Sequence, residues 1–369
     1  MKKILLISNS SWNIINFRKN LIEKLLSNNH QIIVSAPKDD FTKYLDTNKY
    51  KFIPYSYQRK SFNLFENLKI ILFYTNIISK IKPDILLLYT IKPNILISIS
   101  SLFSFKKIKI YNFITGLGSF YFTKSYKKKI FFFLYKLAFI KSEKIIFQNL
   151  DDLNIFINNK IVPKNKALLI PGSGVDIRMF KFNKLVNKTS LHLNFLCVSR
   201  IIRQKGIIEY LEAAKMIKKE FPNTKFYLVG SIDSDNVSGL NINNILKYNE
   251  FFKYSKFTQN IYNLLIKCDC FVLPSYREGT SKSILEAASV GKPIITTDVP
   301  GCNNIVLNNY NGFLCKPKDT NSLYKCLKKM INTNFQKRNQ MSINSRKIVE
   351  KSFDIEIINN QIIRKLQLT

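Results

Sequence analysis

The amino-acid sequence predicts an α/β protein of two domains, each with a parallel sheet covered by helices. Short apolar runs alternate with longer amphipathic stretches, which is the pattern of strand–helix–strand units. The pattern lapses near 171–194, where glycine and proline cluster, and then begins again. A chain of 369 residues also exceeds the roughly 250–300 residues at which single cores stop growing. Two domains with a cleft between them are therefore expected.

In the first half, apolar runs predict strands and the segments between them predict helices. Phe17, Leu21 and Leu25 fall on one side of a helix. Pro37 ends one expected strand and Pro83 introduces another. The expected strands are 4–8, 31–36, 84–89, 109–113 and 144–148, and the expected helices are 16–28 and 68–81.

The second half repeats the alternation. Pro222 ends one expected helix, and Gly291 followed by Pro293 ends another, as is usual after a last helical turn. The expected strands are 194–199, 224–230, 270–274 and 293–297, and the expected helices are 207–221, 260–268 and 281–290.

The composition argues against several classes of protein. A hydrophobic content of 46% argues against disorder. The longest apolar stretches, 95–105 and 130–140, fall short of the roughly 18 residues of a membrane span, and the apolar run 4–7 ends too soon for a signal peptide. We therefore expect a cytoplasmic protein. The 6 cysteines form no CxxC pair and there are only 2 histidines, so no metal is expected.

The charge balance is strongly basic and has two interpretations. Lys and Arg total 58 against 24 Asp and Glu, a formal net charge of +34. An AT-rich coding bias inflates lysine without any function. The alternative is an anionic partner, which is nucleic acid, an acidic membrane surface or a phosphorylated substrate. The two interpretations can hold together.

A basic and aromatic segment lies over 123–142. Lys124, Lys127, Lys128 and Lys129 precede a run of phenylalanines. A basic flank beside a bulky apolar face suits an anionic leaflet, so these four lysines are candidate membrane contacts. An ordinary buried crossover helix with a solvated lysine end explains the same pattern.

Two carboxylates flank an expected helix start in the second half. Glu278 lies in the loop before the helix, and Glu286 lies one to two turns into it. Gly279 permits close approach of the backbone to a ligand, and Thr280 or Ser281 can cap the helix. Free N–H groups and the positive dipole end make such a start an anion site. A nucleotide sugar fits this pattern, with Glu278 on hexose hydroxyls and Glu286 on ribose hydroxyls.

Two cations precede another expected helix. Arg200 follows the strand 194–199, and Lys205 with Gly206 opens the helix 207–221. An Arg fork and a Lys point charge suit a diphosphate and would neutralise charge on a departing nucleotide diphosphate. Each cation alone is typical of a solvated surface; together with the downstream motif they favour function.

These motifs, in this order and spacing, resemble the GT-B-fold retaining glycosyltransferases of family 4 over nearly the whole chain. The stretch GVDIRMF at 174–180 is similar to that family's interdomain linker. A narrower resemblance, to bacterial N-acetylgalactosaminyltransferases that extend undecaprenyl-diphosphate-linked sugars, is carried by GLGSFY at 116–121, NFRKNLIEKL at 16–25 and DVPGC at 298–302. In the first loop, 8–16, many members of the family have glycine and this chain has none.

The resemblance implies a GT-B fold of two Rossmann-like domains that face a central cleft. It implies an N-terminal acceptor-side domain over 1–178 and a C-terminal nucleotide-sugar-binding domain over 179–352. A C-terminal helix over 353–369 is expected to pack back toward the N-terminal domain.

The resemblance also implies roles for individual residues. Arg200 and Lys205 would hold the donor diphosphate and Glu278 would contact the donor sugar, which makes these three the candidate catalytic residues. The implied donor-binding residues are Gly279, Thr280 and Ser281 through backbone N–H groups, Glu286 through the ribose, and Thr115 with Gly116 in a cleft-facing turn. The family is usually metal-independent, so no cofactor besides the nucleotide sugar is expected.

The expected function is transfer of a sugar to a polyprenyl-diphosphate-linked saccharide, in surface polysaccharide or glycan assembly. The donor is expected to be a UDP-N-acetylhexosamine, and the enzyme to lie peripherally on the anionic inner face of the cytoplasmic membrane. Another GT-B nucleotide-sugar enzyme, such as an epimerase, is an alternative that only product analysis separates. A nucleic-acid binder is a further alternative, but the lysines are spread along the chain and no recognised module is present, so no nucleic-acid partner is expected.

Overall fold

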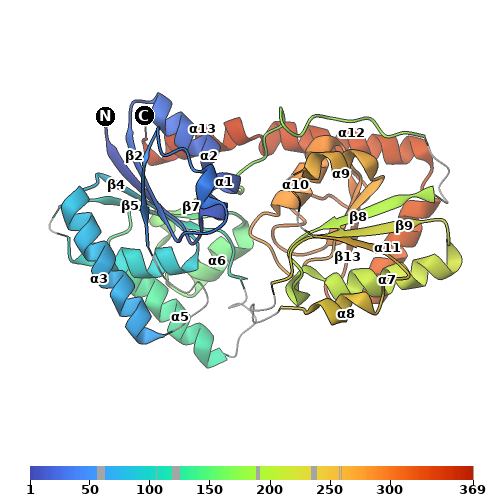
Figure 1. The fold of residues 1–369 in the computed structure, drawn as a ribbon, viewed down its shortest axis with the longest axis horizontal. Helices are drawn as coiled ribbons and strands as arrows, with labels where there is room; N and C mark the ends of the chain where they lie inside the picture. Colours follow the sequence, from blue (N-terminus) through green and yellow to red (C-terminus); the bar gives the residue numbers. More distant parts are fainter. Residues whose placement is uncertain are drawn as a thin grey trace. The chain divides into compact units, whose positions relative to one another are not determined.

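The computed structural model describes residues 1–55, 63–104, 106–118, 125–187, 192–233, 239–256, 258 and 260–368. The chain divides into two compact units (Figure 1). Unit 1 comprises Met1–Ser173 with Ile358–Thr369, and unit 2 comprises Gly174–Ile357. The division at Ser173 falls inside the stretch where the sequence loses its strand pattern.

Unit 1 has a parallel sheet in the order β3-β2-β1-β4-β5-β6-β7. Its strands are β1 Lys3–Ile7, β2 Gln31–Ala36, β3 Lys51–Pro54, β4 Ile85–Tyr89, β5 Lys109–Ile114, β6 Lys144–Phe147 and β7 Ala167–Leu169. Its helices are α1 Ser11–Phe17, α2 Lys19–Ser27, α3 Leu64–Ile81, α4 Ser98–Leu102, α5 Ser125–Ala138, α6 Leu150–Asn158 and most of α13 Ile355–Leu366, with short turns η1 Thr42–Tyr44, η2 Pro93–Ile97 and η4 Lys164–Lys166.

Strand side chains alternate between two cores in unit 1, as the two-residue period of a strand requires. Leu5 and Ile7 of β1 join the core under α3, α5 and α6, whereas Ile4 and Leu6 join the core under α1, α2 and α13. Figure 1 shows the two helix layers on opposite faces of the sheet. The last residues of α13, including Ile362 and Leu366, are buried in the second of these cores.

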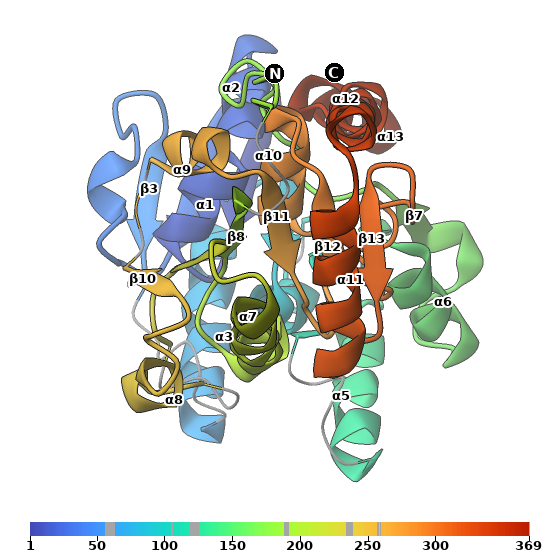
Figure 2. The same ribbon diagram turned by 90° about the vertical axis from the view of Figure 1, so that its right-hand side faces the viewer.

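Unit 2 has a parallel sheet in the order β10-β9-β8-β11-β12-β13, of which Figure 2 shows β8, β11, β12 and β13 side by side. Its strands are β8 Asn194–Val198, β9 Lys225–Val229, β10 Lys253–Ser255, β11 Cys270–Leu273, β12 Ile294–Thr297 and β13 Gly312–Cys315. Its helices are η6 Arg203–Lys205, α7 Ile207–Glu220, α8 Ile242–Leu246, α9 Ile261–Lys267, α10 Lys282–Val290, α11 Thr320–Asn332 and α12 Phe335–Ser352.

Each strand expected from the sequence is present, and two expected helices differ. The helix predicted over 16–28 is two helices, because the backbone leaves helical geometry at Arg18, whose φ is −122° and ψ is −13°. The helix predicted over 68–81 starts earlier, at Leu64, where Asn63 accepts a capping hydrogen bond from the N–H of Phe65.

Residues 125–138 of the basic aromatic segment form α5, and the apolar side chains of this stretch divide between the core and the surface. Phe131, Tyr135 and Phe139 are buried in the core of unit 1, whereas Ile130 and Phe133 are exposed. Among the helices of the described part of the chain, none has the length and hydropathy to cross a membrane.

Candidate functional site

The candidate site lies at the carboxyl edge of the unit 2 sheet. Because all neighbouring strands are parallel, the loops after β8, β9, β11 and β12 leave from the same edge. Arg200 follows β8, and Glu278 lies in the loop after β11. Carboxyl edges of such sheets are where ligands bind in doubly wound folds.

Gly206 joins the two loops that carry the basic and acidic groups. Its φ is +69°, and a Cβ there would lie 2.0 Å from the carbonyl oxygen of Pro274. The N–H of Tyr276 donates to the carbonyl of Gln204 at 2.9 Å, and the Ser275 hydroxyl donates to the same carbonyl at 3.2 Å. The glycine is required because another side chain would force these loops apart.

Lys205 and Glu278, both predicted as catalytic, form an ion pair between Nζ and Oε1. Only 18% and 13% of their side chains are exposed. The Ser275 hydroxyl, whose single proton is shared with the Gln204 carbonyl, lies 2.7 Å from Oε1 of Glu278. The structure therefore brings together a part-buried cation and carboxylate that the sequence places 73 residues apart.

Arg200, the third predicted catalytic residue, lies at the same edge but pairs with another carboxylate. Its Nη1 is 3.3 Å from Oδ2 of Asp233, and 43% of its side chain is exposed. Gly230, which follows β9, allows this approach, since a Cβ there would lie 1.7 Å from the carbonyl oxygen of Ser199. Arg200 thus presents an accessible guanidinium.

The loop from Glu278 to Ser281 is fixed by the turn at Pro300 and Gly301. The N–H of Glu278 donates to Pro300 O, and the N–H of Ser281 donates to Gly301 O, both at 3.1 Å. The Ser281 N–H is therefore engaged within the protein in this structure, and its role toward a donor stays a prediction. Ser281 does occupy the N-cap position of α10, but its hydroxyl makes no capping hydrogen bond to that helix.

Glu286 lies in the second turn of α10, as expected. Its Oε1 is 3.8 Å from Nζ of Lys282, and 13% of its side chain is exposed. Burial raises the pKa of Glu286, and the ammonium of Lys282 opposes that shift. The ammonium of Lys282, one turn away, thus favours the ionised form of the Glu286 carboxylate.

Sequence reasoning missed Asp233, Ser275 and Lys282, the partners of the three charged groups. Lys282 precedes Glu286 by four residues on one helix, a spacing that places side chains together and was available as a signal. Asp233 gave no such signal, because only the sheet brings its loop to Arg200. Ser275 lies three residues before Glu278, and the turn of their shared loop brings the two side chains together.

The other predicted residues lie in unit 1. Thr115 and Gly116 follow β5 and are half-buried, and Gly116 has a φ of +113°. On α5, Lys127 and Lys129 are exposed and Lys128 is half-buried. Lys124 lies outside the described residues, as do residues 119–121 of the GLGSFY stretch.

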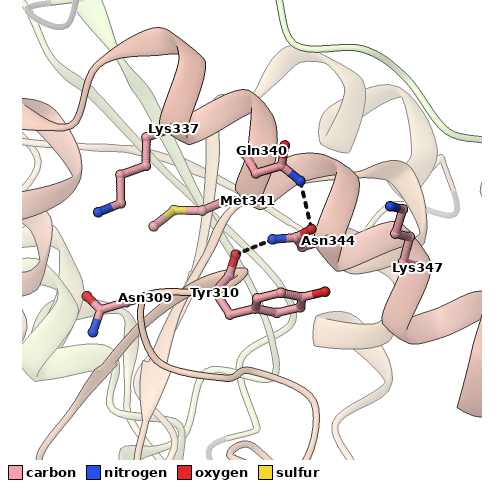
Figure 3. A pocket seen from close by; sticks show the side chains of 7 residues that line it. All are labelled: Asn309, Tyr310, Lys337, Gln340, Met341, Asn344 and Lys347. Carbon is pink, nitrogen blue, oxygen red and sulfur yellow. Dashed lines mark hydrogen bonds between the residues drawn. The ribbon is translucent and has the colours of Figure 1, made fainter.

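A hollow of about 510 Å³ in unit 2 is separate from this site. Asn309 and Tyr310 precede β13, so the hollow lies at the amino edge of the sheet, opposite the charged loops. Figure 3 shows two hydrogen bonds in its lining, from Gln340 to Asn344 and from Asn344 to the carbonyl of Tyr310. Within the described residues, no group of three or more His, Cys, Asp or Glu side chains is placed to hold a metal ion.

Two glycosyltransferase family models and several curated glycosyltransferases match this chain. The family described as Glycosyl transferases group 1 matches residues 182–348, and the family Glycosyl transferase 4-like matches residues 3–149. A Campylobacter jejuni N,N'-diacetylbacillosaminyl-diphospho-undecaprenol alpha-1,3-N-acetylgalactosaminyltransferase is 30% identical over 340 residues, which cover 86% of each chain. The Staphylococcus aureus capsular polysaccharide biosynthesis glycosyltransferase CapM is 28% identical, over 91% of this chain and 90% of CapM.

Solved structures show the same fold at low identity. HepE from Anabaena, solved with UDP and glucose, has a TM-score of 0.77 and 18% identity over 100% of both chains. The sucrose-phosphate synthase of Thermosynechococcus elongatus has a TM-score of 0.82 and 17% identity, over 100% of this chain and 98% of that one. From its relatives and its fold, this chain belongs to the GT-B glycosyltransferases of family 4.

Proposed function

We propose that this glycosyltransferase moves an N-acetylhexosamine from a UDP-sugar to a saccharide carried on a polyprenyl diphosphate, in surface polysaccharide or glycan assembly. The relatives support the acceptor class, since one is named for diphospho-undecaprenol and another for capsular polysaccharide. A third relative, from Escherichia coli, is named as a UDP-Gal:alpha-D-GlcNAc-diphosphoundecaprenol alpha-1,3-galactosyltransferase and is 31% identical over 56% of this chain.

The observation that carries the proposal is the Lys205–Glu278 ion pair beside Arg200 at one sheet edge. A nucleotide diphosphate needs cations that neutralise its charge as it departs. Glu278 keeps Lys205 in place before a donor arrives, and a carboxylate can accept hydrogen bonds from sugar hydroxyls. Glu286 supplies the carboxylate for the ribose.

In the proposed reaction, an acceptor hydroxyl oxygen bonds to the anomeric carbon as the bond from that carbon to the β-phosphate oxygen breaks. The hydroxyl proton passes to the departing phosphate oxygen, so charge balances without a separate base. Both bonds lie on one face of the sugar, which retains the anomeric configuration. Arg200 and Lys205 stabilise the negative charge that accumulates on the nucleotide diphosphate.

We further propose that the reaction needs no divalent cation, because the two cationic side chains supply the positive charge. The support is their position together at the carboxyl edge of the sheet. Transfer should proceed at an unchanged rate after dialysis against EDTA. A loss of activity that Mg²⁺ or Mn²⁺ restores would contradict this part of the proposal.

The proposed place of action is the anionic inner face of the cytoplasmic membrane. Two helices of unit 1 carry exposed apolar stripes at helical spacing. The stripe on α3 is Leu64, Phe65, Leu68 and Leu72, and the stripe on α5 is Tyr126, Ile130, Phe133 and Leu137. Exposed apolar stripes beside lysines are typical of proteins that lie on anionic bilayers.

The decisive experiment is a transfer assay with labelled UDP-sugars and a short-chain prenyl-diphosphate saccharide. Glu278→Ala and Arg200→Ala should each reduce transfer at least about a hundredfold. Arg203→Ala is the matched control, since Arg203 is an exposed cation in the same turn as Lys205. Full activity in both site variants would refute the site, and the anomeric proton of the product tests retention.

A further inference from the structure

Unit 1 has a topological switch point between β1 and β4. The strand order is β3-β2-β1-β4, so the connections from these two strands run to opposite sides. Ile14 of α1, which follows β1, is buried in one core, and Ile95 of η2, which follows β4, is buried in the other. Ligands of open parallel sheets bind in the crevice outside the carboxyl ends at such a point.

Residues at or just beyond the ends of these two strands carry buried polar atoms without a hydrogen-bond partner. Among the described residues, no partner exists for Oη of Tyr89, Oγ1 of Thr90 or Oδ1 of Asn9. Ile7 pairs with Leu88 in the sheet, so Asn9 and Thr90 lie at matching positions just beyond β1 and β4. Buried polar groups in proteins are nearly always hydrogen-bonded, and a cluster of exceptions indicates that their partner is a ligand.

Arg18 brings a buried positive charge to the same place. It is 3% exposed, and its Cζ lies 3.8 Å from the centroid of the Tyr89 ring. Its Nη1 donates to the Ser173 hydroxyl at 2.9 Å, while Nε has no hydrogen-bond partner within the described part of the chain. Arg18 is also in none of the ion pairs between described residues. Buried charges in proteins are ordinarily paired, so we expect the Arg18 guanidinium to bind an anion.

The surroundings hold the charge in a fixed position. Tyr89 stacks in turn on Phe113, with ring centroids 4.3 Å apart, which places three flat groups in one column. Burial lowers the pKa of Arg18 only to about 10, so the guanidinium stays charged at neutral pH. Thr90 has a φ of +72°, a costly conformation for a β-branched residue and one that is found mostly where function requires it.

We propose that this switch-point edge binds the phosphate of the polyprenyl-diphosphate acceptor. Arg18, Tyr89 and Thr90 donate to phosphate oxygens, and the carboxamide oxygen of Asn9 accepts from a hydroxyl of the attached sugar. The acceptor's identity rests on the proposed function. It is favoured over the donor because unit 2 already supplies Arg200 and Lys205 to one diphosphate, and a second phosphate-bearing substrate needs a cation of its own.

The test is a binding measurement that needs no turnover. The chain has 1 tryptophan, Trp12 of α1, so its fluorescence reports on unit 1. The probe is a short-chain prenyl-diphospho-N-acetylglucosamine, titrated without any donor. Inorganic pyrophosphate and UDP-N-acetylglucosamine are titrated separately, the latter by calorimetry.

Tyr89→Phe and Thr90→Val remove one hydroxyl each and preserve shape. Each should raise the Kd of the prenyl probe about tenfold or more, while the melting temperature stays equal or rises, since a buried unpartnered group is lost. Tyr74→Phe is the matched control, because the Tyr74 hydroxyl has a partner in Ser35 Oγ at 2.8 Å. That variant should lower the melting temperature and leave the Kd unchanged.

Three outcomes would overturn the inference. In the first, the wild-type chain binds neither the prenyl probe nor pyrophosphate. In the second, the Tyr89→Phe and Thr90→Val variants bind the probe as the wild type does. In the third, these variants lose affinity for the UDP-sugar instead of the probe. A wild-type chain that binds the probe but transfers nothing would refute the proposed function and leave this site intact.

Discussion

At the scale of single residues, the charged groups of the site are held by one another before any substrate binds. Lys205 pairs with Glu278, Arg200 with Asp233, and Lys282 lies one turn from Glu286. Each cation is therefore already in position, which would lower the entropy cost of ordering it around the proposed donor diphosphate. The same pairing means that a change at one group alters the charge balance of its partner.

The Lys205–Glu278 pair should couple strongly in a double-mutant cycle. Lys205→Met and Glu278→Gln each leave the other charge part-buried without its partner, so each should lower the free energy of unfolding by about 1–3 kcal/mol. The double variant should lose less than the sum of the two. Urea denaturation measures all four chains.

The exposed Lys328–Glu220 pair is the control for this cycle. Its atoms are 2.7 Å apart, but 42% and 41% of its side chains are exposed. Solvent screens such a pair, so its coupling should be clearly smaller than that of Lys205 with Glu278. Equal coupling in the two pairs would show that burial does not strengthen the site pair.

Glu286→Gln should weaken donor binding and increase the stability of the fold. Burial raises the pKa of Glu286, so between its unfolded and folded pKa values the folded chain binds more protons than the unfolded chain. Stability therefore falls as pH rises through that window, and the ionised carboxylate costs stability at neutral pH. Glutamine removes this cost but cannot accept from ribose hydroxyls as a carboxylate does.

Thermal unfolding at pH 5 and pH 8 measures the stability part of this prediction. Glu286→Gln should gain more over wild type at pH 8 than at pH 5, and its kcat/KM for the donor should fall about tenfold to a hundredfold. Lys282→Met has the opposite effect, because it removes the cation that stabilises the ionised carboxylate. This variant should lose more stability at pH 8 than at pH 5. A gain that is the same at both pH values would contradict the role given to burial.

How far the sequence predicts the site differs between these residues. Glu278 and Lys205 were predictable because each lies next to an expected helix start, where local geometry already favours anions. Arg200 was predictable from its place directly after an expected strand, and Glu286 from its place in the first turns of an expected helix. Asp233 was not, because β9 and β8 must pair before its loop approaches Arg200. In unit 1, Arg18 lies inside a helical pattern that gave no sign of a break or a buried charge.

At the scale of elements, the turn from η6 to α7 sets the geometry of the site. Gly206 is the N-cap of α7 and has a left-handed φ of +69°, directly after Lys205. Its closeness to Pro274 fixes the spacing between the loop that carries Lys205 and the loop that carries Glu278. The backbone, rather than side-chain packing alone, therefore aligns the two charges.

Gly206→Ala should disturb both stability and donor affinity. A Cβ would lie 2.0 Å from Pro274 O at a strained φ, so the free energy of unfolding should fall by about 2 kcal/mol or more. Gly118→Ala is the control, because its φ of +58° is also left-handed but the nearest atom, Ile91 Cδ1, is 3.5 Å away. If both variants lose the same stability, strain and not the clash explains the effect.

Three of the elements that sequence reasoning missed are edge strands with weak local signals. The edge strands β3, β7 and β10 are four, three and three residues long and have no fully buried residue. Strands inside the sheets, such as β4 and β11, are buried throughout and were predicted from their apolar runs. Short edge strands depend on pairing with a neighbour, which composition and periodicity do not reveal.

At the scale of the whole molecule, the net charge is +34, and unit 1 adds exposed apolar residues beside some of its lysines. The lysines of α5 stand beside exposed apolar residues of the same helix, and α3 presents a second apolar stripe. If charge alone attracted the protein to the membrane, high salt would abolish binding. If apolar contact alone attracted it, high salt would leave binding unchanged. The combination predicts membrane binding with two separable parts.

Vesicle sedimentation should resolve these two parts. Replacing Lys127, Lys128 and Lys129 by Gln removes about 1 kcal/mol per lysine near the surface, so affinity for anionic vesicles should fall about a hundredfold at low salt. At high salt, where charges are screened beyond a few ångströms, this variant should bind as weakly as wild type. Replacing Ile130 and Phe133 by Ser should instead reduce the binding that remains at high salt.

The matched control replaces three exposed lysines of unit 2, Lys219, Lys225 and Lys253, by Gln. It changes the net charge by the same amount as the α5 variant, so any difference between the two variants reflects position and not total charge. Equal losses of vesicle affinity would show that binding depends on the total positive charge of the chain, and α5 would then have no special role. A loss confined to the α5 variant would locate the membrane contact on unit 1.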